Sequence, residues 1–97
     1  MTPEGKVKER VKKLLKRFNV YYHMPVQNGM GEPTLDFICC VSGRFLAIET
    51  KAPGNHMTPR QKLTANKMET AGGFVLEIST DDDLARLEGY LALIDSI

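Results

Sequence analysis

The sequence lacks the features that would place it in a membrane or in a disulfide-linked scaffold. None of its apolar runs approaches the ~20 residues that a membrane helix needs, and its charged, amphipathic N-terminus is unlike a signal peptide. Its 97 residues include two cysteines, Cys39 and Cys40. Adjacent side chains on a strand point to opposite faces, so this pair offers neither a disulfide framework nor joint ligands for one metal. We expect both to be small core residues of a reduced, cytoplasmic protein.

Repeats, low-complexity tracts and linkers are also absent, so we expect a single domain over residues 1–97. The net charge of +1 hides an asymmetry along the chain. Residues 1–17 carry seven Lys or Arg against two Glu, whereas residues 77–97 carry one Arg against six acids. A basic N-terminal helix can follow the phosphates of a nucleic acid, and it can equally be a solvated face that lysines keep soluble.

Hydrophobic periodicity predicts helices that alternate with strands. Thr2 and Pro3 are typical of a helix start, and Thr58-Pro59 followed by Gln61 fits a capping box. The predicted elements are helices at 2–18, 58–71 and 80–97, and strands at 19–26, 34–41, 44–51 and 74–79. The helical crossover before the last strand makes it parallel to its neighbour. The sequence therefore predicts an α/β fold of αβββαβα order, with a mixed β-sheet flanked by helices.

Three polar residues converge on one end of the central hairpin. If Ser42-Gly43 forms a two-residue turn, paired residue numbers sum to 85, and Asp36 lies directly opposite Glu49. Their Cβ atoms are then roughly 5 Å apart, on one face of the sheet. Alternation places Lys51 on that face and Thr50 on the other.

Two carboxylates this close repel each other unless a proton or a cation lies between them. Hard oxygen ligands of this kind suit Mg²⁺ or Mn²⁺. Each residue also has a simpler interpretation, because Glu49 and Lys51 can form a surface ion pair and Asp36 can cap a turn. The convergence of Asp36, Glu49 and Lys51 on one face favours a site.

This pattern resembles the PD-(D/E)XK nuclease superfamily and, within it, the stand-alone phage members of the VRR-NUC (virus-type replication-repair nuclease) family. The matching stretches cover nearly the whole chain: EGKVKERVKKLL, MPVQNGMGEPTLDFICC, GRFLAIETKAPG, TPRQK and AGGFVLEI. In many relatives the Pro and Asp are adjacent, whereas here Thr34 and Leu35 lie between Pro33 and Asp36. The resemblance implies a restriction-endonuclease-like core and a divalent-metal-dependent nuclease of DNA replication, repair or recombination.

The resemblance also implies roles for individual residues. Asp36, Glu49 and the backbone carbonyl of Thr50 would hold Mg²⁺ or Mn²⁺. Lys51 would orient or deprotonate the attacking water and offset charge on the phosphate. Gln61 matches the glutamine at the family's helix start beside the active site, although its position equally fits a capping box.

The superfamily places a glutamate on the first helix near the metal, and here Glu4 and Glu9 compete. On a helical wheel Glu4 falls within the apolar stripe and Glu9 opposite it, so we assign Glu4 as the additional metal ligand and catalytic residue. Glu4 can equally be a helix N-terminal acid that complements the dipole.

We expect no membrane partner, and the resemblance implies that the partners are DNA and a second copy of the chain. Branched or structured DNA, such as four-way junctions, forks or flaps, is the expected substrate, in the cytoplasm of a phage-infected or bacterial host cell. The alternative is a non-catalytic module that binds structured DNA. The candidate DNA-binding residues are Lys6, Lys8, Lys12, Lys13, Lys16, Arg17, Gln27, Asn28, Arg60 and Lys62.

Overall fold

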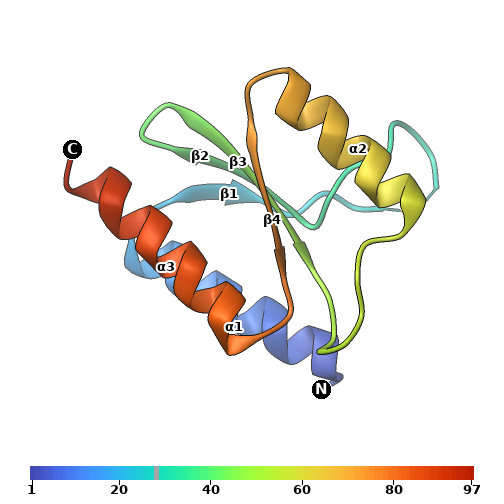
Figure 1. The fold of residues 1–97 in the computed structure, drawn as a ribbon, viewed down its shortest axis with the longest axis horizontal. Helices are drawn as coiled ribbons and strands as arrows, with labels where there is room; N and C mark the ends of the chain where they lie inside the picture. The colour runs from blue at the N-terminus through green and yellow to red at the C-terminus, as the bar shows by residue number, and fades with distance from the viewer. Residues whose placement is uncertain (28) are drawn as a thin grey trace.

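The computed structural model describes residues 1–27 and 29–97. Their helices and strands follow one another in the predicted αβββαβα order (Figure 1). Asn28, one of the candidate DNA-binding residues, lies outside the described part. The elements are α1 (Pro3–Arg17), β1 (Tyr21–His23), β2 (Phe37–Val41), β3 (Arg44–Thr50), α2 (Pro59–Thr70), β4 (Phe74–Ile78) and α3 (Asp81–Asp95).

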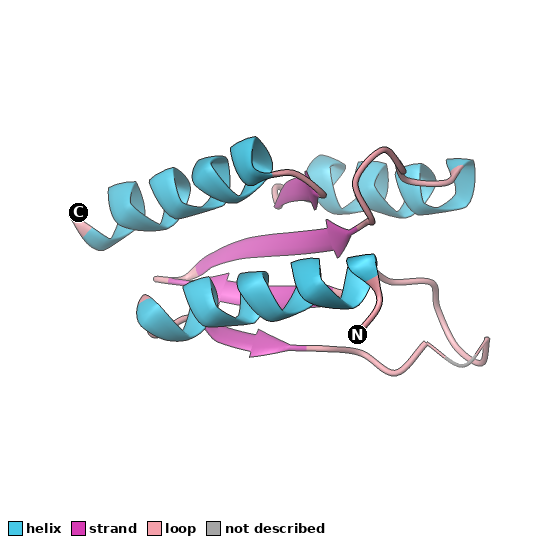
Figure 2. Ribbon diagram, turned by 90° about the horizontal axis from the view of Figure 1, so that it is seen from below, coloured by secondary structure: helices cyan, strands magenta, loops and turns pink. Residues whose placement is uncertain are grey.

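The four strands form one mixed sheet in the order β1-β2-β3-β4. The pairs β1-β2 and β2-β3 are antiparallel, and β4 is parallel to β3. This parallel pair confirms the prediction made from the helical crossover. In Figure 2, α1 and α3 run in roughly the same direction as the strands.

The core has two parts, one on each face of the sheet. The larger cluster joins α1 and α3 to the sheet, and its fully buried members include Val11, Phe37 and Leu87. The smaller cluster lies beneath α2 and consists of Leu35, Ala47 and Ala65, with partly buried neighbours. Helices therefore cover both faces, as the apolar strands predict.

The central hairpin has the predicted register. Ser42 and Gly43 form its turn with φ angles of 48° and 82°, which is the conformation of a two-residue hairpin turn with positive φ at both positions. The pairing runs from Phe37 opposite Ile48 to Val41 opposite Arg44, so paired numbers sum to 85. The pairing ends one residue short of Asp36 and Glu49, and there the Asp36 backbone N–H donates to the Glu49 carboxylate.

Strands β1 and β2 are several residues shorter than predicted, whereas β3 and β4 each end one residue early. Strand β1 covers Tyr21–His23 instead of 19–26, because Asn19 has a left-handed φ of 55° after α1 and Pro25 has no N–H for a ladder. Strand β2 begins at Phe37 instead of residue 34, so Asp36 immediately precedes it.

The two cysteines occupy opposite faces of β2, as predicted, but only Cys39 is a core residue. Cys39 packs in the larger cluster, where burial raises the pKa of its thiol to about 12. Cys40 is exposed, which contradicts the expectation that both are buried. Both are free thiols.

The acidic run 81–83 is a helix N-terminus, as predicted. Thr80 and Asp83 form a reciprocal capping box, and the Asp83 carboxylate also accepts from the Ser79 amide. Burial opposes ionisation, but these hydrogen bonds and Arg86 prevail and lower the pKa of Asp83 to about 2. Within the described residues, we find no helix with the length and apolar character needed to span a bilayer.

Candidate active site

Two carboxylates are buried together at the end of the central hairpin. Glu49 lies near the end of β3 and is 3% exposed, and Asp36 lies just before β2 and is 9% exposed. The Asp36 backbone N–H donates to Glu49 Oε1 at 3.2 Å. The hairpin register thus brings these two acids into the same site, as the sequence predicts.

Thr50 holds the Asp36 carboxylate. Asp36 Oδ2 accepts from the Thr50 amide at 3.0 Å and from the Thr50 hydroxyl at 2.6 Å. Alternation along β3 sets Thr50 on the face opposite Glu49 and Lys51, so its contact with Asp36 departs from the prediction that the Asp36 side chain points to the same face as Glu49. Alternation does not govern Asp36 because it precedes the paired part of β2, where Leu35 is fully buried beneath α2. The Asp36 carboxylate is consequently free to turn toward Thr50.

Lys51 and Gln61 surround the Glu49 carboxylate. Lys51 Nζ lies 3.7 Å from Glu49 Oε2, and Gln61 Nε2 donates to the same oxygen at 2.9 Å. Gln61 also completes the capping box of α2, since its Oε1 accepts from the Thr58 amide at 3.0 Å. The two interpretations of Gln61 are therefore compatible, because one end of its amide caps the helix and the other end contacts the site.

The N-terminal half of α1 reaches the site through Lys8. Lys8 Nζ lies 3.6 Å from Glu4 Oε2 and 3.9 Å from Asp36 Oδ1. Glu9 is paired with Lys12 at 3.3 Å. Glu4 is therefore the acid of α1 that lies on the side of the site, which is the arrangement that the helical wheel predicts. Lys8, a DNA-binding candidate from the sequence, lies beside these carboxylates, and its role in DNA binding stays a prediction.

Glu77 has no role in the sequence-based prediction, yet it positions the loop between the site and α2. It is the register partner of Glu49 on β4, and its Oε1 accepts from the Met57 amide at 2.7 Å. Its Oε2 lies 2.8 Å from His56 Nδ1. Burial opposes ionisation of Glu77, but these contacts prevail and lower its pKa. The loop that leads to Thr58 and Gln61 is thereby fixed to the sheet.

The electrostatics of the site favour a cation. Burial and the negative charge of Asp36 raise the pKa of Glu49 to about 7, although Lys51 and the Asp36 amide act in the opposite direction. Glu4 adds a smaller effect of the same sign as Asp36. The pair therefore carries negative charge that the nearby lysines only partly offset, and a divalent cation would stabilise both carboxylates in ionised form.

The donor set fits a hard cation bound by few protein ligands. Among residues 1–27 and 29–97, no three His, Cys, Asp or Glu side chains gather closely enough to bind one ion. Mg²⁺ commonly binds through one or two carboxylates and completes its coordination with waters and substrate phosphate oxygens. Asp36 and Glu49 match that pattern, and Glu4 as a further ligand stays a prediction.

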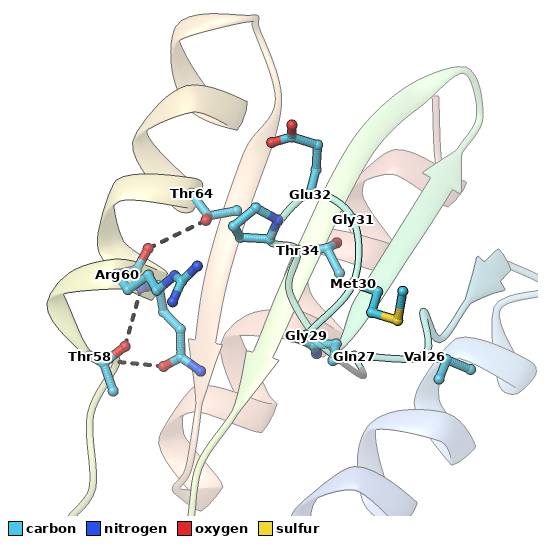
Figure 3. Close-up of a pocket in the computed structure, with 12 residues that line it drawn as sticks. Val26, Gln27, Gly29, Met30, Gly31, Glu32, Thr34, Thr58, Arg60 and Thr64 are labelled. Carbon is cyan, nitrogen blue, oxygen red and sulfur yellow. Dashed lines mark hydrogen bonds between the residues drawn. The ribbon is translucent and has the colours of Figure 1, made fainter.

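A pocket adjoins the carboxylates, between residues 26–27 and 29–34 on one side and the start of α2 on the other (Figure 3). Its volume is about 320 Å³. Gln27 and Gln61 form part of its wall, and Gln27 Nε2 donates to Asp36 Oδ1 at 3.3 Å. Arg60 also lines this pocket, whereas Lys62 lies on another side of α2, near Met57.

The remaining basic residues of α1 divide into two groups. The C-terminal half of α1 is tied to α3 by the ion pair of Arg17 with Glu88 at 2.8 Å, and Arg10 pairs with Asp81 at 2.7 Å. The acidic end of the chain therefore offsets part of the basic end. On α1, the exposed lysines for which the described part of the chain shows no ion pair are Lys6, Lys13 and Lys16.

The described chain has a mixed sheet with helices on both faces and two buried acids at the end of its central hairpin. A solved structure described as a VRR_NUC domain is similar to this chain over 93% of its length and over 98% of that structure, with a TM-score of 0.79 and 15% identity. The chain therefore has the fold of a VRR-NUC domain, as the resemblance in its sequence predicts. No protein-family model and no curated protein matches the sequence.

Proposed function

We propose that this protein is a divalent-metal-dependent deoxyribonuclease that hydrolyses phosphodiester bonds in branched or structured DNA. The observation that supports the proposal most strongly is the buried pair of Asp36 and Glu49, with Lys51 Nζ 3.7 Å from Glu49. A protein that only binds DNA has no use for buried carboxylates where phosphate must approach, because like charges repel.

Asp36 and Glu49 would hold Mg²⁺ or Mn²⁺, together with the Thr50 carbonyl. The bound ion would lower the pKa of a water molecule and polarise the scissile phosphate. Thr50 fixes the orientation of Asp36 through its amide and hydroxyl, and Gln61 fixes that of Glu49. The Lys51 amine would orient or deprotonate the attacking water and stabilise negative charge that develops on the phosphate.

DNA would lie across the site with its backbone near the exposed cations. Lys6 on α1 and Arg60 and Lys62 on α2 are the candidates closest in sequence to the catalytic residues. A second copy of the chain is part of the proposal, because one small domain offers little surface to a branched duplex. The exposed side chains of Leu93 and Ile97, at 63% and 79%, are available for such an interface on α3 and the C-terminal residues.

The two glutamates of α1 give a matched pair of variants. Glu4→Ala removes the acid beside Lys8, and we expect roughly tenfold slower metal-dependent cleavage because the lysine would then pair more strongly with Asp36. Glu9→Ala removes a carboxylate that pairs only with Lys12, and we expect its cleavage rate to equal that of the wild type. Rates would be measured on a labelled substrate after circular dichroism has established an intact fold. A greater loss for Glu9→Ala than for Glu4→Ala would reverse the assignment.

The double role of Gln61 can be separated by Gln61→Glu. A glutamate at this position keeps the capping-box acceptor but loses the donor that contacts Glu49 Oε2. We expect a thermal midpoint near that of the wild type at pH 6 and about tenfold slower cleavage. Gln61→Ala should lose the same activity and also about 1 kcal/mol of stability. Full activity in both variants would show that Gln61 serves only to cap α2 and has no role in cleavage.

Cleavage of a substrate panel tests the proposed function. The panel contains labelled duplex, flap, fork and four-way junction, each incubated with Mg²⁺, Mn²⁺ or EDTA. The proposal predicts products in at least one metal on a branched substrate and no products in EDTA. Salt-sensitive binding of the same DNA without products in either metal would instead favour a non-catalytic DNA-binding module.

A further inference from the structure

The pocket beside the active site shares two side chains with it. Gln27 and Gln61 line the pocket, and the same two side chains donate to Asp36 Oδ1 and Glu49 Oε2. A ligand in the pocket would therefore be separated from a phosphate at the carboxylates by these two side chains. A neighbouring group on the same DNA strand would fit this arrangement.

The lining of the pocket is mixed in character and balanced in charge. It contains one cation, Arg60, and one carboxylate, Glu32. A subsite for a phosphate alone would be expected to have a net positive lining. This pocket is better suited to a neutral, flat group that has both apolar faces and hydrogen-bonding edges.

The two walls supply the two kinds of contact that such a group needs. The loop brings the apolar side chains of Val26 and Met30, which are 83% and 84% exposed. Helix α2 brings the hydroxyl of Thr58 and the guanidinium of Arg60, which Figure 3 shows across the pocket from the loop. Nucleobases combine apolar faces with donor and acceptor edges, and arginine and glutamate are common partners of those edges.

We propose that this pocket binds the base of an unpaired nucleotide next to the scissile phosphate. The inference rests on the proposed nuclease function and specifies its substrate. A base in a duplex is paired and stacked, so its entry would require unpairing, at a cost that is smallest where the base is already unpaired. The pocket therefore selects DNA in which the strand becomes single at or beside the cleavage point.

The first test compares two flap substrates that differ only at the branch. One has normal bases in its single-stranded arm, and the other has a short run of abasic nucleotides in that arm beside the branch. We expect kcat/KM of the wild-type protein in Mn²⁺ to be roughly tenfold lower on the abasic arm. Equal cleavage of both arms would overturn the inference and leave the nuclease in place.

Two variants test whether the pocket causes this difference. Thr34→Phe fills the pocket, and Arg60→Ala removes its guanidinium. In both, the ratio between normal and abasic arms should fall toward one. Lys67→Ala removes a cation from the same helix outside the pocket and should keep the wild-type ratio. A tenfold ratio that persists in both Thr34→Phe and Arg60→Ala would overturn the inference.

A binding measurement separates the pocket from the chemistry. Fluorescence anisotropy in EDTA would compare short labelled single strands with and without bases. We expect roughly tenfold tighter binding of the strand with bases, and loss of that difference in Arg60→Ala. Base-dependent binding without cleavage of any substrate would support the pocket and overturn the nuclease, whereas binding that ignores the bases would overturn the pocket.

Discussion

Lys51→Ala is expected to lower kcat for metal-dependent DNA cleavage by roughly 10²–10³-fold. The variant removes the only amine that lies near Glu49 Oε2 in the described part of the chain. Since that amine stabilises ionised Glu49, the pKa of Glu49 should rise further and the pH profile of the remaining activity should shift upward. Single-turnover rates from pH 6 to pH 9 would measure both effects.

Lys67→Ala is the matched control for this variant. Lys67 is an exposed lysine on α2 that lies away from the carboxylates, so its loss should leave the cleavage rate and the pH profile unchanged. DNA binding by Lys51→Ala in EDTA should stay within about twofold of the wild type, since one phosphate contact at most is lost. Cleavage by Lys51→Ala at the wild-type rate would refute the catalytic role of Lys51.

Glu49→Gln is expected to abolish cleavage and, in EDTA at pH 8, to stabilise the fold. Burial and Asp36 raise the pKa of Glu49 to about 7, from an ordinary value of 4.5. The folded state therefore holds the proton more tightly than the unfolded state, and ionisation of Glu49 lowers stability as the pH rises through this interval. The total cost above pH 7 is about 3 kcal/mol. Gln stays neutral and avoids it.

Urea denaturation in EDTA at pH 5 and pH 8 would measure this effect. At pH 8 the free energy of unfolding of Glu49→Gln should exceed that of the wild type by about 1–3 kcal/mol. The lower part of this range allows for Gln61, which must rearrange when its acceptor changes. At pH 5 the difference should be small. Glu69→Gln, an exposed change on α2, should show no pH-dependent difference. If Glu49→Gln changed the free energy of unfolding by the same amount at both pH values, the raised pKa of Glu49 would be contradicted.

The fold was largely predictable from local signals. The caps at Thr2 and Thr58 and the Ser42-Gly43 turn define where elements begin and how the hairpin pairs, and all three have the expected geometry. These signals work because each depends on residues within a few positions in sequence. The ends of β1 and β2 were not predictable to the residue, because an apolar stretch does not reveal where pairing stops.

The acids of the site were predictable from the register, whereas most of their partners were not. A two-residue turn at Ser42-Gly43 is enough to predict that Asp36 and Glu49 lie close together, and Gln61 follows from its position in α2. The Thr50 hydroxyl bond depends on a bend in the chain at Asp36 that alternation cannot describe. Lys8 reaches Asp36 only through the packing of α1 on the sheet, which one-dimensional patterns do not contain.

From the sequence, the basic N-terminal helix could either bind phosphates or form a solvated face. The structure adds a third role, which is ion pairing with α3. Arg10 and Arg17 pair with acids of α3, so part of the basic end serves to join two helices. Such exposed pairs contribute little stability individually. Lys6, Lys13 and Lys16 remain the better candidates for DNA contacts on α1.

The most direct test of the metal site is the anomalous difference map of a crystal grown or soaked in Mn²⁺. The account predicts a peak within coordination distance, about 2–2.5 Å, of carboxylate oxygens from both Asp36 and Glu49. The peak should be absent from crystals of Glu49→Gln treated in the same way. A wild-type map with no peak at this pair, or with its strongest peak at other residues, would contradict the claim that these two acids form the metal centre of a nuclease.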